Sequence, residues 1–168
     1  YQTSTYVQEA PGVNKGYCYT RTGNPTRSSL QSALAKLEGG THAFSFATGI
    51  AAENAIFQVF LKPGDKVVVP YDLYGGTHRL LFSIYEQWQI KVERADFRDP
   101  AAVAAASKDA AIVWGESPTN PRLDVYDVPE IIKQIKAASK ALIVVDNTFA
   151  TPLSQKPLDL GAEPVTRD

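Results

Sequence analysis

The sequence predicts an α/β fold in which helices cover both faces of an open, mostly parallel sheet. Two observations support this prediction. Short apolar runs rich in β-branched residues alternate along the chain with amphipathic segments, a pattern typical of parallel sheets with helical crossovers. The 168 residues are 44% hydrophobic and 21% charged, close to the average of soluble globular domains, so the chain is long and apolar enough to bury a core.

Five apolar runs are predicted as strands, and most of them lack polar alternation, as expected for strands buried on both faces. They are HAFSF (42–46), KVVVP (66–70), IKVERAD (90–96), AAIVWGE (110–116) and ALIVVDN (141–147). Four segments with helical periodicity are predicted as helices, at 25–38, 48–61, 75–88 and 127–140. The first is expected to end at Gly39 and Gly40, and the last to begin at Asp127 with Pro129 in its first turn.

The first 25 residues show little periodicity and many turn residues, and we predict an extended arm or loop there. The formal net charge of −1 and the lack of a basic stretch give no support to nucleic-acid binding. One cysteine and two distant histidines predict neither a disulfide nor a metal site. No apolar run approaches the roughly 18–20 residues that span a bilayer. We expect a cytoplasmic protein whose natural N-terminus lies before Tyr1.

Ligands of open parallel sheets bind at the carboxyl ends of the strands, so the residues after each strand are candidates for chemistry. Thr48, Gly49 and Ile50 open a helix after the first predicted strand, and the free N–H groups there suit an anion such as phosphate. Neither a Walker loop nor a dinucleotide fingerprint is present. The alternative, which is the commoner situation in such turns, is a glycine required only for steric reasons.

Aromatic and amide side chains follow the next strands. Tyr74 comes after the 66–70 strand, and Gly75 and Gly76 leave its ring uncovered for stacking on a flat ligand. Asn120 lies between two prolines after the 110–116 strand, which hold the strand exit stiff and direct its amide. The structural alternatives are a tyrosine at the rim of the core and an ordinary proline turn.

Asp146 ends the last predicted strand, in apolar surroundings where an unpaired carboxylate is costly. A protonated heteroaromatic nitrogen would be a suitable partner, and Thr148 could donate a hydrogen bond to the same ligand. The alternative is an aspartate that caps the following turn. Together, the strand ends offer a phosphate site, a stacking ring, an amide donor and an acid, which are the contacts that pyridoxal phosphate needs.

With these residues identified, the chain resembles the cystathionine γ-synthase and γ-lyase group of pyridoxal-phosphate enzymes of cysteine and methionine metabolism. The motifs are YTRTGNPT, TGIAAE, YGGT, ESPTNP and VDNTFATP, in the family's order and at family-like intervals over almost the whole chain. The resemblance implies an aspartate-aminotransferase-like large domain (PLP fold type I), incomplete at the C-terminus. Residues 1–25 would be an arm reaching a neighbouring subunit, and 26–168 part of the cofactor-binding domain, with the small C-terminal domain absent.

The resemblance also implies a role for each matching residue. The amides of Gly49 and Ile50 would bind the phosphate. The remaining contacts within the subunit would come from Tyr74 on the ring face and in proton relay, Asn120 near the phenolic oxygen, Asp146 at the pyridine nitrogen and Thr148 beside it. Tyr19 and Arg21 would cross a dimer interface to the neighbour's phosphate, and Tyr19 would join Tyr74 in catalysis, in a homotetramer built from dimers.

One departure from the family concerns the Schiff-base lysine of its Ser-x-Thr-Lys motif. Gly161 to Glu163 match the approach to that motif, but Pro164 replaces a β-branched residue and the chain ends at Asp168, about three residues short of the lysine. None of the ten lysines has the required context, and Lys156 comes too early. We therefore expect either a fragment of a longer enzyme or a natural truncation, which alone would bind the cofactor weakly and not turn over.

The implied activity is elimination or replacement at the γ-carbon of cystathionine or an O-acylhomoserine, by a synthase or lyase rather than a β-lyase. Alternatives within the family are an O-acetylhomoserine sulfhydrylase and a methionine γ-lyase. A different alternative is a non-catalytic partner subunit that contributes Tyr19 and Arg21 to a complete neighbour. An aminotransferase of the same fold is disfavoured, because YTRTGNPT and VDNTF fit the sulfur-amino-acid group better.

Overall fold

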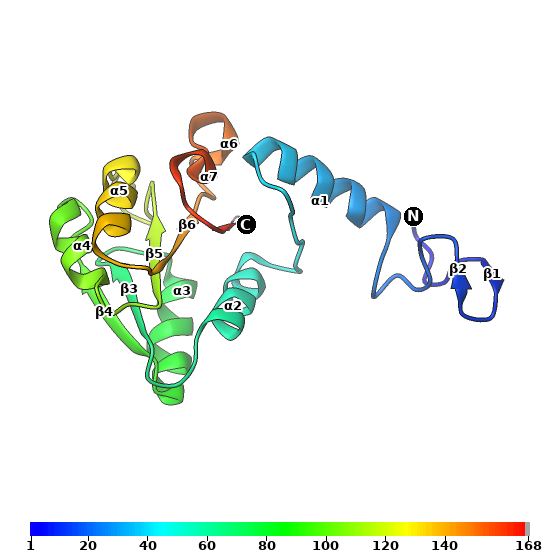
Figure 1. The fold of residues 1–168 in the computed structure, drawn as a ribbon, viewed down its shortest axis with the longest axis horizontal. Helices are drawn as coiled ribbons and strands as arrows, with labels where there is room; N and C mark the ends of the chain where they lie inside the picture. The colour runs from blue at the N-terminus through cyan, green and yellow to red at the C-terminus, as the bar shows by residue number, and fades with distance from the viewer. Residues whose placement is uncertain (167–168) are drawn as a thin grey trace. The chain divides into compact units, whose positions relative to one another are not determined.

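A computed structural model describes residues 1–166, which fall into two compact units divided after Ser45. The first unit contains an antiparallel hairpin of β1 (Gln8–Ala10) and β2 (Val13–Asn14), followed by α1 (Pro25–Glu38) (Figure 1). The predicted arm therefore contains a short hairpin. The boundary between the units also groups α1 with this hairpin.

Helix α1 has the ends that the sequence predicts. Asn24 caps its start, because the side-chain oxygen accepts a hydrogen bond from the N–H of Thr26 at 2.9 Å. Gly39 ends it with φ at +75°, a left-handed conformation that glycine adopts without steric cost.

The second unit is built on a five-stranded parallel sheet with the order β4-β3-β5-β6-β7. The strands are β3 (Lys66–Pro70), β4 (Lys91–Ala95), β5 (Ile112–Glu116), β6 (Leu142–Asp146) and β7 (Val165–Thr166). Four of the five predicted strands are thus confirmed. The two-residue β7 pairs with the end of β6, and Pro164 lies just before it, where its carbonyl accepts a hydrogen bond from Val145.

The prediction of a strand at 42–46 is wrong. These residues have no regular secondary structure, and the side chain of Phe44 is 77% exposed. Within residues 1–166, this segment pairs with no strand, and backbone groups without a neighbouring strand cannot form a ladder. The apolar pattern alone does not specify whether a neighbour exists.

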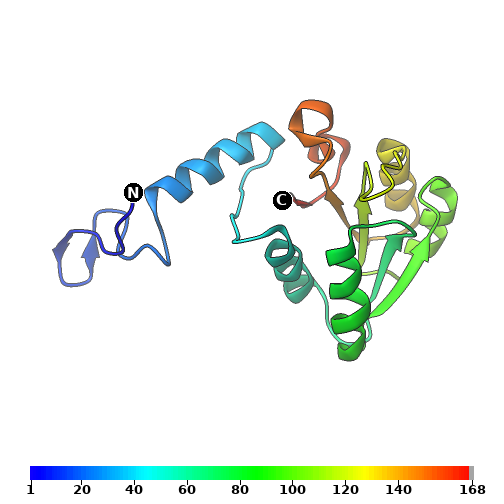
Figure 2. The same cartoon turned by 180° about the vertical axis from the view of Figure 1, so that it is seen from behind.

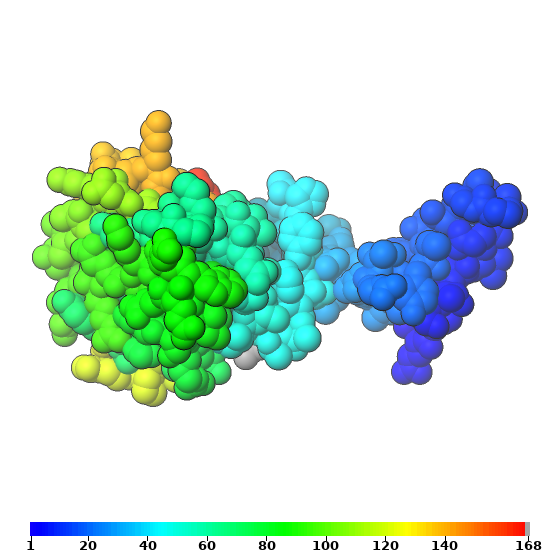
Figure 3. Space-filling view, turned by 90° about the horizontal axis from the view of Figure 1, so that it is seen from below, coloured from blue at the N-terminus to red at the C-terminus, as the bar shows by residue number. Residues whose placement is uncertain are grey.

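Helices cover both faces of the sheet, as predicted. On one face, α4 (Pro100–Ser107) and α5 (Val128–Ala138) pack against apolar side chains of β3, β5 and β6. On the other face lie α2 (Gly49–Phe60) and α3 (Gly75–Arg79) (Figure 2). Phe57 of α2 and Leu81, which follows α3, are fully buried against the strands. In Figure 3 the 49–60 and 75–88 segments lie side by side at the surface.

The predicted helix at 75–88 consists of three helical stretches. After α3 the chain continues as a π-helix, η1 (Leu80–Ile84), and a 3₁₀ turn, η2 (Tyr85–Trp88). Asp127 caps α5 by accepting from the N–H of Glu130 at 3.0 Å, as expected. Sequence reasoning missed the short α6 (Thr151–Ser154) and α7 (Pro157–Leu160), and also α4, although Asp99 followed by Pro100 is a readable start signal.

Within residues 1–166, no helix combines the length and the apolar character needed to cross a membrane.

Candidate cofactor site

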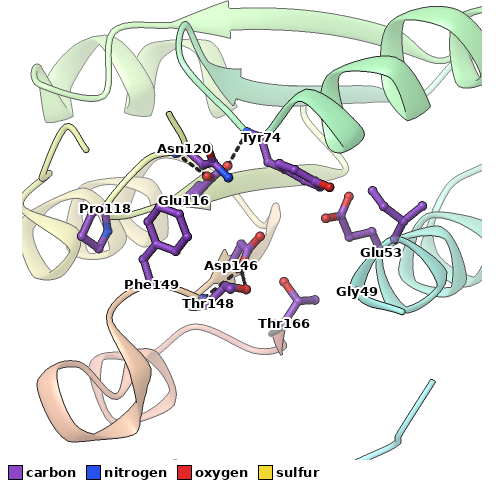
Figure 4. Close-up of a pocket in the computed structure, with 11 residues that line it drawn as sticks. Gly49, Glu53, Tyr74, Glu116, Pro118, Asn120, Asp146, Thr148, Phe149 and Thr166 are labelled. Carbon is purple, nitrogen blue, oxygen red and sulfur yellow. Dashed lines mark hydrogen bonds between the residues drawn. The ribbon is translucent and has the colours of Figure 1, made fainter. Parts of the chain in front are cut away.

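A cavity of about 260 Å³ opens where the strands of the second unit end. Strands β5 and β6 are neighbours in register, so that their last residues, Glu116 and Asp146, lie side by side. Tyr74 follows β3, and Gly49 begins α2. Figure 4 shows α2 on one side of the cavity and Pro118 and Phe149 on the opposite side.

Six of the eight predicted site residues line this cavity: Gly49, Ile50, Tyr74, Asn120, Asp146 and Thr148. Five further lining residues were not predicted, namely Glu53, Glu116, Pro118, Phe149 and Thr166. The cavity therefore brings together residues from distant parts of the sequence. Tyr19 and Arg21 belong to the first unit, where the guanidinium of Arg21 lies 5.3 Å from the centre of the Tyr19 ring. Their role at a neighbour's phosphate stays a prediction.

The first turn of α2 has the features of an anion site. Thr48 is in the extended conformation and caps the helix, with its hydroxyl oxygen accepting from the N–H of Ala51 at 3.1 Å. Gly49 and Ile50 follow as the first two helical residues and line the cavity. The N–H groups and the positive end of the helix dipole at the start of a helix favour an anion.

Asp146 is 8% exposed and accepts two hydrogen bonds on Oδ1, from the hydroxyl of Thr148 at 2.6 Å and from its backbone N–H at 3.0 Å. In this structure the hydroxyl of Thr148 donates to Asp146 and orients the carboxylate, while a hydrogen bond from Thr148 to a ligand stays a prediction. The capping interpretation of Asp146 is confirmed, and its pairing with a ring nitrogen stays a prediction. It caps the turn after β6, and it also lines the cavity.

A family model described as "Cys/Met metabolism PLP-dependent enzyme" matches residues 1–167. The chain belongs to this family. Curated relatives include a cystathionine β-lyase of Coxiella burnetii, 43% identical over 99% of this chain, and a cystathionine γ-synthase of Mycobacterium bovis, 41% identical over 98%. A crystal structure of cystathionine γ-lyase from Lactobacillus plantarum, complexed with L-serine, is 42% identical with a TM-score of 0.90 over 99% of this chain.

The chain spans about 43% of the length of each of these relatives. The predicted aspartate-aminotransferase-like large domain with a mostly parallel sheet is confirmed by these likenesses and by the sheet described above. The family is pyridoxal-phosphate dependent, as the resemblance implied.

The cavity of this Cys/Met-metabolism family member has donors and acceptors that fit pyridoxal phosphate. The start of α2 suits the phosphate, the Tyr74 ring offers an aromatic face, and Asp146 offers a carboxylate. The buried hydroxyl of Thr166 also lines the cavity and has no hydrogen-bond partner among the described residues, so it is available to a polar ligand. Lys156 is exposed in the turn before α7 and is not among the described lining residues.

Glu116 is the most informative residue that sequence reasoning missed. Its carboxylate is 5% exposed and accepts hydrogen bonds from the backbone N–H groups of Tyr74 and Asn120, both at 2.7 Å. Burial, assisted by the nearby carboxylates of Asp146 and Asp72, raises the pKa of this carboxyl to about 7 against the lowering effect of the two amides. The sequence did contain a feature that could have identified Glu116 as a site residue, because it ends an apolar strand in the same way as Asp146.

Gly76 determines where the Tyr74 ring can lie. A Cβ atom added at Gly76 would overlap Cε1 of Tyr74 and Cδ1 of Ile50, which both line the cavity. At the preceding Gly75, an added Cβ would meet only the end of the Arg79 side chain, at 3.4 Å. The observed position of the Tyr74 ring therefore requires glycine at position 76 but not at position 75.

We predict that Gly76→Ala lowers the affinity for pyridoxal phosphate about tenfold, because it displaces the stacking ring. Gly75→Ala is the matched control, since it gives α3 the same gain in helix propensity without the overlap. Cofactor titration followed by absorbance measures both variants. Equal affinities for the two variants would contradict the assigned position of Tyr74.

Proposed function

We propose that the protein carrying this chain uses pyridoxal phosphate to eliminate or replace the γ-substituent of sulfur-related amino acids such as cystathionine or an O-acylhomoserine. The observation that supports this most is the meeting of six predicted contact residues in one cavity at the strand ends. Family membership and relatives with cystathionine-related names support the same reaction class.

Each of the six predicted residues of the cavity has a task in this proposal. The N–H groups at the start of α2 bind the phosphate, and Tyr74 stacks on the ring. Asn120 lies by the phenolic oxygen, while Asp146, oriented by Thr148, pairs with the ring nitrogen and keeps a proton on it. The bound cofactor then supplies an electron sink for carbanions of the substrate.

The oligomer is part of the proposal. We infer a homotetramer built from dimers, in the cytoplasm, with Tyr19 and Arg21 reaching the phosphate of the neighbouring subunit. An arginine suits that reach because its guanidinium binds phosphate with two parallel hydrogen bonds. Both residues are in the first unit and at least partly exposed, which leaves them accessible to a neighbouring subunit.

A second candidate is β-elimination of cystathionine, favoured by the relatives that are named cystathionine β-lyase. The two reactions break different carbon–sulfur bonds of one substrate. Elimination at the γ-carbon gives cysteine, 2-oxobutanoate and ammonia, whereas elimination at the β-carbon gives homocysteine, pyruvate and ammonia.

The test is to incubate the purified full-length protein with pyridoxal phosphate and cystathionine, and separately with an O-acylhomoserine and cysteine. We expect 2-oxobutanoate from the first mixture or cystathionine from the second. Pyruvate with homocysteine would establish the second candidate instead. Sulfide or methionine as substrates would reveal a sulfhydrylase or a methionine γ-lyase. No product from any mixture, with cofactor bound, would refute the proposed function.

A further inference from the structure

The side chain of Glu116 joins two loops of the cavity that follow different strands. Its Oε2 accepts from the N–H of Tyr74, which follows β3, and its Oε1 accepts from the N–H of Asn120, which follows β5. We call this arrangement of one carboxylate and two N–H groups the Glu116 clamp. Strands β3 and β5 are neighbours in the sheet, so the clamp fixes the spacing of two adjacent strand exits.

The clamp needs a carboxylate. Two N–H donors converge on the side chain from different directions, and only an ionised carboxyl group offers an acceptor oxygen to each without carrying a hydrogen of its own. Glutamine presents one oxygen and one NH₂ group, and the NH₂ would face an N–H donor. Aspartate is shorter by one methylene and cannot reach both amides from the end of β5.

The two amides belong to the residues that present the aromatic face and the side-chain amide to the cavity. We propose that Glu116 is a positioning residue, which orients Tyr74 and Asn120 toward the cofactor by accepting a hydrogen bond from the backbone N–H of each. This inference rests on the proposed function, and it adds a residue that does not itself need to touch the cofactor.

The charges around the clamp make it sensitive to pH. The carboxylates that act on Glu116 are Asp146 of β6 and Asp72 of the loop after β3. The other titratable groups that line a cavity together with Glu116 are Glu53 of α2, Tyr74, and Tyr126 before α5. Among the described residues that line the cavity, none is a lysine or an arginine. Protonation of Glu116 would leave one of the two amides without a proper acceptor.

The clamp also opposes folding stability. The pKa of Glu116 in the folded chain, about 7, lies above the ordinary value of 4.5. Such a group contributes stability that is complete below pH 4.5 and is lost as the pH rises through about 7. The ionised form that the clamp needs is therefore the form that burial disfavours, which is understandable if the residue serves the site.

The first test observes the two amides directly, in protein without cofactor. We expect the amide NMR signals of Tyr74 and Asn120 to shift together with pH, with one midpoint near 7. In Glu116→Gln, both signals should be displaced and insensitive to pH in this range, while in the exposed control Glu86→Gln they should behave as in the wild type. If Glu116→Gln does not fold, the pH titration of the wild type is sufficient as a test. Tyr74 and Asn120 amide signals that do not shift with pH would overturn the clamp.

The second test links the clamp to the cofactor. We expect Glu116→Gln to bind pyridoxal phosphate about tenfold more weakly, with Glu116→Asp also impaired and Glu86→Gln unchanged. Affinity equal to that of the wild type would overturn the positioning role. A wild-type protein that binds no pyridoxal phosphate would instead refute the proposed function, so the two failures are distinguishable.

Discussion

Replacement of Asp146 by asparagine is expected to weaken the binding of pyridoxal phosphate by about a hundredfold or more. Asp146 is nearly buried at the end of β6, and the removal of one partner from a buried charge pair costs about 3–5 kcal/mol. Asparagine keeps an oxygen that accepts from Thr148, so the turn should persist while the negative charge is lost. A cofactor titration followed by absorbance measures the effect.

A second, independent effect is expected in Asp146→Asn. Because the carboxylate of Asp146 raises the pKa of Glu116, its removal should lower that pKa toward 4.5. The pH midpoint of the Tyr74 and Asn120 amide signals should therefore move downward in Asp146→Asn. The control is Asp159→Asn, an exposed residue of α7. Unchanged cofactor affinity in Asp146→Asn would show that this carboxylate does not pair with the ring.

Replacement of Phe57 by alanine is expected to lower the free energy of unfolding by about 3–5 kcal/mol. The Phe57 side chain is 0% exposed, and its ring lies 5.3 Å from that of Tyr85 and 5.1 Å from that of Trp114 between ring centres. Removal of this ring would leave a cavity between α2 and the sheet. Urea unfolding followed by circular dichroism measures the difference.

Phe60→Ala is the matched control, because it removes the same side chain from the same helix at a position that is 51% exposed. We expect a loss well below that of Phe57→Ala, since a half-exposed ring buries less apolar surface. Similar losses for the two variants would mean that the core on this face of the sheet does not depend on Phe57.

Most of the sheet could be predicted from the sequence, because β3, β5 and β6 are continuous apolar runs. The composition of each run is enough to predict a buried strand. The prediction failed at 42–46, where the run is apolar but Phe44 is exposed and no described strand lies beside it. Whether a segment forms a strand depends on a neighbouring strand as well as on its own residues. The sequence of the segment alone does not show whether that neighbouring strand exists.

The candidate site was predictable where position in a parallel sheet decides it, as for Asp146 and Tyr74. Gly49 was predicted as following a strand at 42–46 that does not form, but the helix start that was predicted with it is present. Glu116 escaped because its partners are main-chain N–H groups, one of them 42 positions earlier in the chain. Any residue except proline supplies such a donor, so no side-chain pattern marks the pair in advance. The direction of the Thr148 hydroxyl was also settled by local geometry that the spacing of two residues leaves open.

The adjacent placement of Glu116 and Asp146 has a consequence for how the cavity exchanges ions with the solvent. At neutral pH the pair already holds part of a hydrogen ion, because Glu116 titrates near 7 beside its neighbour. A cationic ring bound beside the pair would lower the pKa of Glu116, so that Glu116 would lose its proton. Loading of the site with a cationic ring is therefore expected to release a proton from Glu116 near neutral pH.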